Sequence, residues 1–218
     1  MNKKFDRYFY EGILENPNIT DDIINKFLYN KPNKIIMEAI AGSEKSSSQH
    51  LEYIYNEIKN FGVQLNLASN KKTPHNILKK LFKDFTEEVY ENPNIPPDLI
   101  SDFLSQKKPR TKKERENYDN NWIALAHNPA LSKEEQLKIA KKMKFNPDIQ
   151  WNLYLNPALH FETFEYLWSK GVTNCAEKFL SSSNFESTCI DMLLGSDDDF
   201  IRCNFNRMRV LSNPKINH

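Results

Sequence analysis

Glycine, cysteine and long apolar runs are all scarce in this chain. Its 218 residues include five glycines and three cysteines, and no Cys-x-x-Cys pair occurs. No apolar stretch approaches the roughly 18 residues of a membrane-spanning helix. Because Cys175, Cys189 and Cys203 have no histidine at ligand spacing, we expect reduced, buried packing thiols; the alternative is a metal or redox site.

An excess of charge of one sign is also lacking. Thirty Lys and Arg residues balance 29 Asp and Glu residues, so the formal net charge is +1, and the mean hydropathy is −0.69. The overall charge therefore implies neither nucleic acid nor an acidic partner. Residues 1–6 already include the acidic Asp6 and lack the apolar core of a secretion signal, so we expect a cytoplasmic protein. Abundant Asn, Lys and Ile suggest an AT-rich bacterial or phage genome.

Catalytic signatures are the third absence. The histidines are scattered, and none pairs with Ser, Cys or a carboxylate in a known catalytic order; they are His50, His75, His127, His160 and His218. Ser196 followed by Asp197, Asp198 and Asp199 is typical of a capped helix start, whereas a divalent cation there would need further oxygen ligands. We therefore expect no enzyme activity, cofactor or metal.

A repeated phrase is what the chain does contain: an apolar residue three positions before an Asn-Pro pair. We call the Asn of each phrase, or the Ser in its place, an anchor. Clear anchors are Asn16, Asn92, Asn128, Asn156 and Asn213, and looser ones without the full Asn-Pro are Ser43, Asn70 and Ser182. Successive anchors are 22 (from 70 to 92) to 36 (from 92 to 128) residues apart. Such self-similarity indicates an array of stacked units.

Helices are expected on both sides of each anchor. Apolar residues recur eight, eleven and twelve positions after it, as Ile24, Phe27 and Leu28 do after Asn16, and these offsets share one face of a helix. Gln136 breaks this pattern after Asn128. Since Pro disfavours a helical residue before it and Asn tolerates left-handed or turn geometry, a second helix should end at each anchor, over 5–14, 34–41, 122–126 and 149–155. Such small units bury their apolar faces by stacking.

Residues 92–100, which read NPNIPPDLI, and residues 122–129, which read WIALAHNP, resemble the two halves of the bacterial leucine-rich repeat variant. That family is an α-helical repeat of the HEAT-like superhelical group. The resemblance implies an all-α, right-handed solenoid of about seven helix–turn–helix repeats over residues 1–218 as a single domain. It implies little about function. The family has a recurrent Arg six positions before the anchor, and this chain keeps it only at Arg207. In the repeat of Asn128, Trp122 stands at that position.

The best functional candidate is residues 106–121, which we expect to be a basic loop inserted between repeats. Its six cations stand against Glu114, Glu116 and Asp119, a local net charge of +3. Insertions in such arrays often lie on the binding face, although a flexible solvated linker is the alternative. Trp122 and Trp151 either add an aromatic surface or pack in the core. The candidate partner-binding residues are Lys107, Lys108, Arg110, Lys112, Lys113, Arg115, Trp122 and Trp151.

Three functions remain open. The leading hypothesis is a non-enzymatic module that binds a partner protein through its solenoid surface and basic loop. A phage or bacterial inhibitor or adaptor that acts by occluding its target would be a protein of this kind. The second is nucleic-acid binding, with the basic loop and the two tryptophans lining a groove. The third is an alkylpurine DNA glycosylase, as in some HEAT-like proteins, but no matching Trp/Asp pair is evident. The partner's identity and the oligomeric state are left open.

Overall fold

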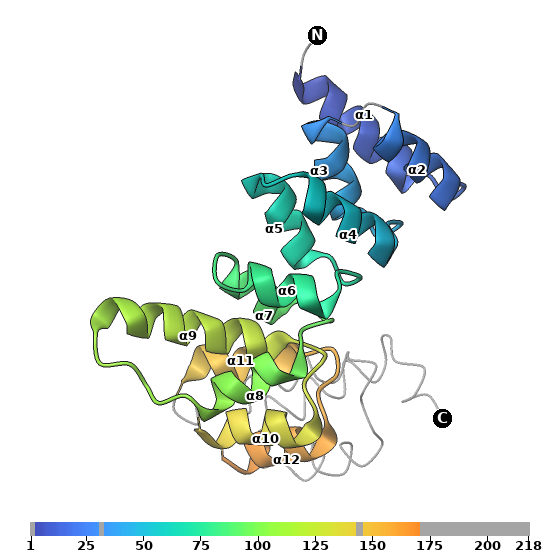
Figure 1. Cartoon of the computed structure of the whole chain (residues 1–218). Coiled ribbons are helices and arrows are strands. Elements are labelled where there is room, and N and C mark those ends of the chain that lie inside the picture. Colours follow the sequence, from blue (N-terminus) through green and yellow to red (C-terminus); the bar gives the residue numbers. More distant parts are fainter. Residues whose placement is uncertain (1–2, 31–32, 143–145, 171–218) are drawn as a thin grey trace, which may run out of the picture. The chain divides into compact units, whose positions relative to one another are not determined.

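The chain is all-helical over the residues that the computed structural model describes, which are 3–30, 33–142 and 146–170, with side chains from residue 8 onward. These residues form twelve α-helices and no strand, as the all-α prediction requires (Figure 1). The helices are α1 (Lys3–Glu15), α2 (Asp21–Tyr29), α3 (Lys34–Gly42), α4 (Ser48–Glu57), α5 (Phe61–Ser69), α6 (His75–Leu81), α7 (Thr86–Glu91), α8 (Pro97–Ser105), α9 (Lys112–His127), α10 (Lys133–Lys142), α11 (Pro147–Leu155) and α12 (Phe161–Ser169).

Several sequence predictions fall outside these ranges. They concern the three cysteines, the acidic run after Ser196, Arg207 and the anchors Ser182 and Asn213. The described chain divides between two compact units, unit 1 (residues 1–103) and unit 2 (residues 104–218). A single array of about seven repeats stays a prediction.

Each odd-numbered helix ends at an anchor, as predicted. Helix α1 stops directly before Asn16, and the C-caps of α3, α5, α7, α9 and α11 are Ser43, Asn70, Asn92, Asn128 and Asn156. The even-numbered helix of each pair begins a few residues later. Ser132 and Glu135 form a capping box before α10, with Ser132 N–H donating to Glu135 Oε2 at 2.8 Å and Glu135 N–H donating to Ser132 Oγ at 3.3 Å.

The backbone at the anchors is not left-handed, which was one of the two expected geometries. The five C-cap anchors have φ between −78° and −60° and ψ between 119° and 134°, which is extended backbone. A following Pro favours this conformation. It also lets the anchor side-chain oxygen accept the N–H two residues on, as Asn92 Oδ1 does from Asn94 at 2.8 Å and Ser43 Oγ does from Lys45 at 3.2 Å. The prediction was therefore right about the helix end, and of the two expected geometries the structure shows the turn.

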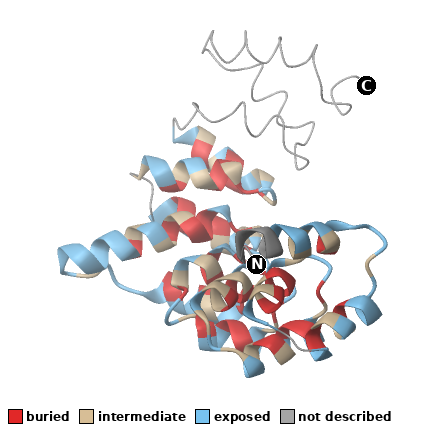
Figure 2. Cartoon of the chain, turned by 90° about the horizontal axis from the view of Figure 1, so that it is seen from above, coloured by how far each residue is buried: buried red, intermediate tan, exposed pale blue. Residues whose placement is uncertain are grey.

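The buried side chains follow the predicted offsets. Three positions before the anchors, Ile40, Leu67, Val89, Leu125 and Leu153 are completely buried. After the anchors, the buried residues include Ile24, Leu28, Leu51, Ile54, Leu78, Leu81, Ile100, Phe103, Phe164 and Leu167. Figure 2 colours the buried residues of the described helices red. In unit 1, α3 packs against α1 and α5, and α5 against α7; in unit 2, α9 packs against α11 and α10 against α12.

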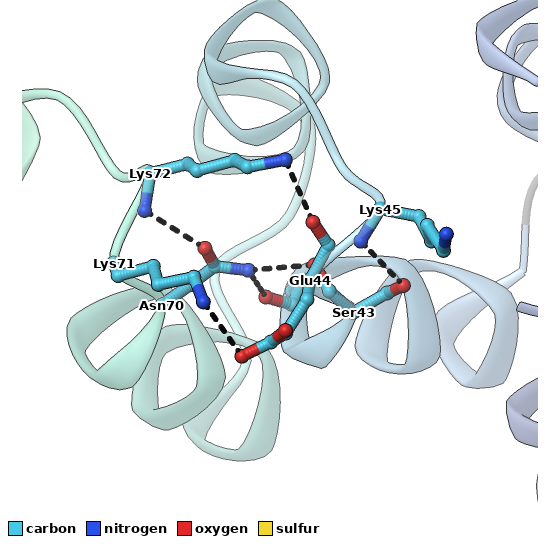
Figure 3. A network of polar contacts seen from close by, with 7 residues as sticks. Ser43, Glu44, Lys45, Asn70, Lys71 and Lys72 are labelled. Atoms are coloured by element: carbon cyan, nitrogen blue, oxygen red, sulfur yellow. Dashed lines mark hydrogen bonds and ion pairs between the residues drawn. The ribbon is translucent and has the colours of Figure 1, made fainter. Parts of the chain in front are cut away.

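The anchor side chains also join neighbouring helix pairs, a role that the sequence reading missed. Asn70 Nδ2 donates to the carbonyl oxygens of Ala41 at 2.8 Å and Ser43 at 3.0 Å (Figure 3). Asn92 repeats these bonds one pair later on Ala68 and Asn70. In unit 2, Asn156 does the same on Ala126 and Asn128. We call this double donation the anchor clamp.

The anchor clamp explains why an asparagine suits this position. Asn92 and Asn156 are each 1 % exposed, and a buried polar side chain without hydrogen bonds is costly. Each amide accepts within its own turn and donates twice to the preceding pair. Serine has one hydroxyl and no amide, so Ser43 lacks the group that makes the double donation.

Candidate functional site

The predicted basic loop is non-helical only over residues 106–111, which we call the linker. From Lys112 onward the chain is helical, so the expected loop boundary at residue 121 was wrong. The cause is a capping interaction. Thr111 Oγ1 accepts the N–H of Glu114 at 3.4 Å and donates to the Glu114 carboxylate at 2.7 Å. A Thr three residues before a Glu is a recognised helix start, and this signal was present in the sequence.

The linker is held at both ends by cationic side chains. Lys142 Nζ, at the end of α10, donates to the carbonyl oxygens of Leu104 at 3.1 Å and Gln106 at 2.9 Å. Arg115, in the first turns of α9, donates through Nε to Pro109 at 3.1 Å and through its guanidinium to Arg110. These hydrogen bonds favour a positioned linker over a flexible one, because they restrict the linker backbone before any partner binds.

All six predicted cations are exposed and belong to residues 106–116, which we call the basic segment. Two of them lie near acids. Lys108 Nζ is 3.8 Å from Asp119 Oδ1, and Lys112 Nζ is 4.0 Å from Glu116 Oε1. Both distances are at the long end for ion pairs, and the Lys112 side chain is 93 % exposed. Such pairs are weak in water, so they leave the segment able to interact with an anion.

Trp122 does not belong to this surface. It is completely buried, so of the two alternatives for this residue the structure shows core packing and not an aromatic surface. The physical reason is its register on α9, where it lies three residues before the buried Leu125 and therefore on the same face. Its ring packs edge-on against Tyr118, with centroids 5.8 Å apart, and Lys142 Nζ lies 4.9 Å from its centroid. Trp122 thus supports the lysine that holds the linker.

Trp151, in contrast to Trp122, is accessible to a partner. It lies on α11 and is 40 % exposed. Of the two predicted aromatic contacts, only Trp151 can therefore meet a partner directly.

A cavity of about 760 Å³ opens beside the linker within unit 2. This size is within the usual range for binding sites of small ligands. Its lining residues are Gln106, Lys107, Lys108, Tyr118, Lys142, Asn146, Pro147 and Asp148. The structure thus brings Lys107 and Lys108 together with Lys142, which is far away in sequence. Arg110, Lys112, Lys113, Arg115 and Trp151 do not line the cavity.

Lys142 and Tyr118 are site residues that sequence reasoning missed. Lys142 lies in the last turn of α10, where a cation is ordinary, and only the tertiary structure shows its bonds to Leu104 and Gln106. Burial, and secondarily the charge of Lys138, lowers the pKa of Lys142. The cavity therefore contains a lysine in a crowded, partly desolvated positive environment.

Helix α11 begins at this cavity. Asn146 Oδ1 accepts the N–H groups of Asp148 at 3.0 Å and Ile149 at 3.3 Å, so the first turn is already capped. The residues of α11 that line the cavity therefore lie at the positive end of its helix dipole.

Over the described residues, no three His, Cys, Asp or Glu side chains are grouped so that they would hold a metal ion. None of the helices in the described ranges is long and apolar enough to cross a bilayer. No protein-family model, curated protein or solved structure matches the chain.

Proposed function

We propose that this protein is a non-enzymatic interaction module that binds an acidic surface of a partner protein through the basic segment of unit 2. The observation that carries the proposal is the positioned linker, which presents exposed cations while Lys142 and Arg115 hold its backbone. A surface that is ordered before binding loses less conformational entropy on association. Exposed cations also accelerate encounter with an acidic partner.

We further propose that the helix pairs belong to a right-handed solenoid of about seven repeats, of the leucine-rich repeat variant type. The recurrence of the anchor clamp, twice in unit 1 and once in unit 2, supports stacking of equivalent pairs. Such arrays offer extended surfaces for docking. A cytoplasmic phage or bacterial inhibitor that occludes its target fits this proposal and the composition of the chain.

Nucleic-acid binding is the competing function, and the burial of Trp122 weakens it. The hypothesis needs aromatic side chains on which bases stack, and only Trp151 of the predicted pair is exposed. The cations alone attract phosphates and carboxylates alike. Protein binding is therefore the function we carry forward, and nucleic acid is an outcome of the test.

The test compares two charge-neutralised variants with the wild type in affinity capture from bacterial lysate. The first replaces Lys107, Lys108, Lys112 and Lys113 by Gln. The matched control replaces four exposed lysines of unit 1, Lys71, Lys79, Lys80 and Lys83, by Gln. We expect a protein that is retained by the wild type and the control, lost from the first variant, and released by salt.

Two results would contradict the proposal. One is equal retention of every captured protein by both variants, which would remove the basic segment from the interface. The other is capture of nucleic acid alone, shown by loss of all partners after nuclease treatment, which would favour the competing function. Circular dichroism of each variant checks that the fold is kept.

A further inference from the structure

The cavity beside the linker is a more specific feature than the exposed charge around it. Its lining contains three lysines and a single acid, Asp148. Lys107 and Lys108 come from the linker, whereas Lys142 comes from the end of α10. Three cationic side chains thus line one hollow, and an anion placed in it would meet opposite charge.

We infer that this cavity receives a carboxylate side chain from an acidic segment of the partner protein, with Lys107 and Lys108 as its direct ligands. The inference rests on the proposed function and adds the chemistry of the contact. Lys142 acts differently, as a positioning residue. Its Nζ is already bonded to two carbonyl oxygens, so it keeps the linker, and with it Lys107 and Lys108, at the cavity.

The rest of the lining suits an acidic side chain. Tyr118, which is 4 % exposed, provides an aromatic wall for the methylene groups of a glutamate. The start of α11 adds the positive end of its dipole, although Asn146 already caps its first N–H groups. Lys108 is 3.8 Å from Asp119 Oδ1, a separation longer than a normal hydrogen bond. This leaves its ammonium group able to bind an incoming carboxylate.

We assign the cavity to a carboxylate, the anion that an unmodified acidic segment carries, and treat a phosphate as an outcome of the test. No arginine lines the cavity, so a bidentate guanidinium contact to either anion is absent and recognition relies on the lysine charges. The two nearby arginines, Arg110 and Arg115, do not line the cavity, and the Arg115 guanidinium is bonded to linker carbonyl oxygens.

The experiment measures binding of a fluorescently labelled peptide of alternating Glu and Gly by fluorescence anisotropy. It uses the full chain as wild type, as Lys107→Gln/Lys108→Gln, and as Lys112→Gln/Lys113→Gln. The two variants remove the same charge from the same segment, but only the first pair lines the cavity. A peptide of alternating Gln and Gly is the neutral control.

We expect the cavity variant to lose roughly tenfold or more in affinity, because hydrogen bonds to charged groups are among the stronger ones. The Lys112/Lys113 variant should lose only about threefold or less, as for exposed charges without a defined geometry. The neutral peptide should bind neither the wild type nor the variants.

Three outcomes would overturn the inference. Equal losses in both variants would show that the surface charge acts without the cavity. Tighter, cavity-dependent binding of a phosphoserine peptide or of single-stranded DNA would show a different ligand. Absence of peptide binding by the wild type at low salt would also contradict it. If the lysate partner is still captured in that case, the proposed function stands and the inference alone fails.

Discussion

Unit 1 and unit 2 reinforce the anchor clamp in different places. In unit 1, the turns at Ser43 and Asn70 have lost their prolines and are joined at the surface, where Lys71 Nζ is 2.8 Å from Glu44 Oε1 (Figure 3). Unit 2 has an exposed ion pair of the same kind, Lys133–Glu162 at 3.0 Å, and its interior contains a buried amide link where unit 1 has the buried His50. That link is Gln136, the residue that breaks the apolar pattern, which is completely buried.

The side chain of Gln136 connects α10 to the following turn. Its Nε2 donates to the carbonyl oxygens of Ala158 at 2.9 Å and Leu131 at 3.3 Å, and its Oε1 accepts the N–H of His160 at 3.0 Å. Exposed ion pairs contribute little to the free energy of unfolding because water and salt screen them. Removing a buried amide that makes its hydrogen bonds costs more, because its partners are left unpaired. We therefore expect the buried Gln136 to contribute more to stability than the exposed ion pairs of either unit.

The largest expected effect comes from the cores, tested by Leu51→Ala in unit 1 and Leu167→Ala in unit 2. Both leucines are buried, at 0 % and 1 % exposed. Each truncation should lower the free energy of unfolding by about 2–5 kcal/mol, because burial and close packing are lost together. Urea denaturation measures it. A loss below about 0.5 kcal/mol, the level of a surface substitution, would contradict the assigned core.

The anchor clamp gives the next effect and should be equal in the two units. Asn92→Ala and Asn156→Ala should each cost about 1–3 kcal/mol, because two buried carbonyl oxygens lose their donors. The control is Asn16→Ala, at an exposed anchor of α1, where a change within about 0.5 kcal/mol is expected. If the control costs as much as the buried sites, the asparagines act only as local turn residues.

Gln136→Leu tests what is particular to unit 2. The substitution places an apolar residue eight positions after the anchor, as in the other repeats. It leaves the Ala158 carbonyl oxygen and the His160 N–H without the Gln136 side chain as hydrogen-bond partner. We expect a net loss of about 1 kcal/mol, since the gain in apolar burial offsets part of the lost hydrogen bonding. The exposed Gln49→Leu is the control in unit 1. A more stable Gln136→Leu protein would mean that the link is dispensable.

The smallest effect is a pH dependence in unit 1. His50 is 4 % exposed; its Nδ1 accepts the N–H of Ser47 at 3.1 Å and its Nε2 lies 3.1 Å from Asn25 Oδ1. Burial lowers the pKa of His50, and Asp21 only partly opposes this shift. The folded state therefore binds a proton less readily than the unfolded state, and stability should decline as the pH falls below about 6.5.

Thermal melting across this pH range checks the sign. His50→Gln should remove the decline, since Gln also serves in a capping box but does not titrate. His75→Gln, at an exposed histidine of the same unit, should leave it in place. A decline that persists in His50→Gln would assign the pH dependence to other groups.

Sequence reasoning succeeded where the cause is local. The helix ends at the anchors follow from backbone restrictions within two residues, as at Asn92 before Pro93. The start of α9 was also local, in Thr111 and Glu114, and was overlooked. The burial of Trp122 could have been derived from its spacing to Leu125.

The remaining features depend on tertiary distances. The donation from Asn70 to Ala41 spans 29 residues, and the bond from Lys142 to Leu104 spans 38. Neither spacing is encoded in a short motif, because both contacts follow from how the helices pack. The cavity could not be predicted for the same reason, since its lysines approach one another only in the folded chain.

The most direct test of the central claim is lysine acetylation footprinting of the chain with and without its captured partner, read by mass spectrometry. The lysines of the basic segment and those of unit 1 at positions 71, 79, 80 and 83 are all exposed and serve as matched reporters. Docking on the basic segment predicts that the partner protects Lys107, Lys108, Lys112 and Lys113 and leaves the unit 1 reporters reactive. Protection confined to the unit 1 reporters would contradict it.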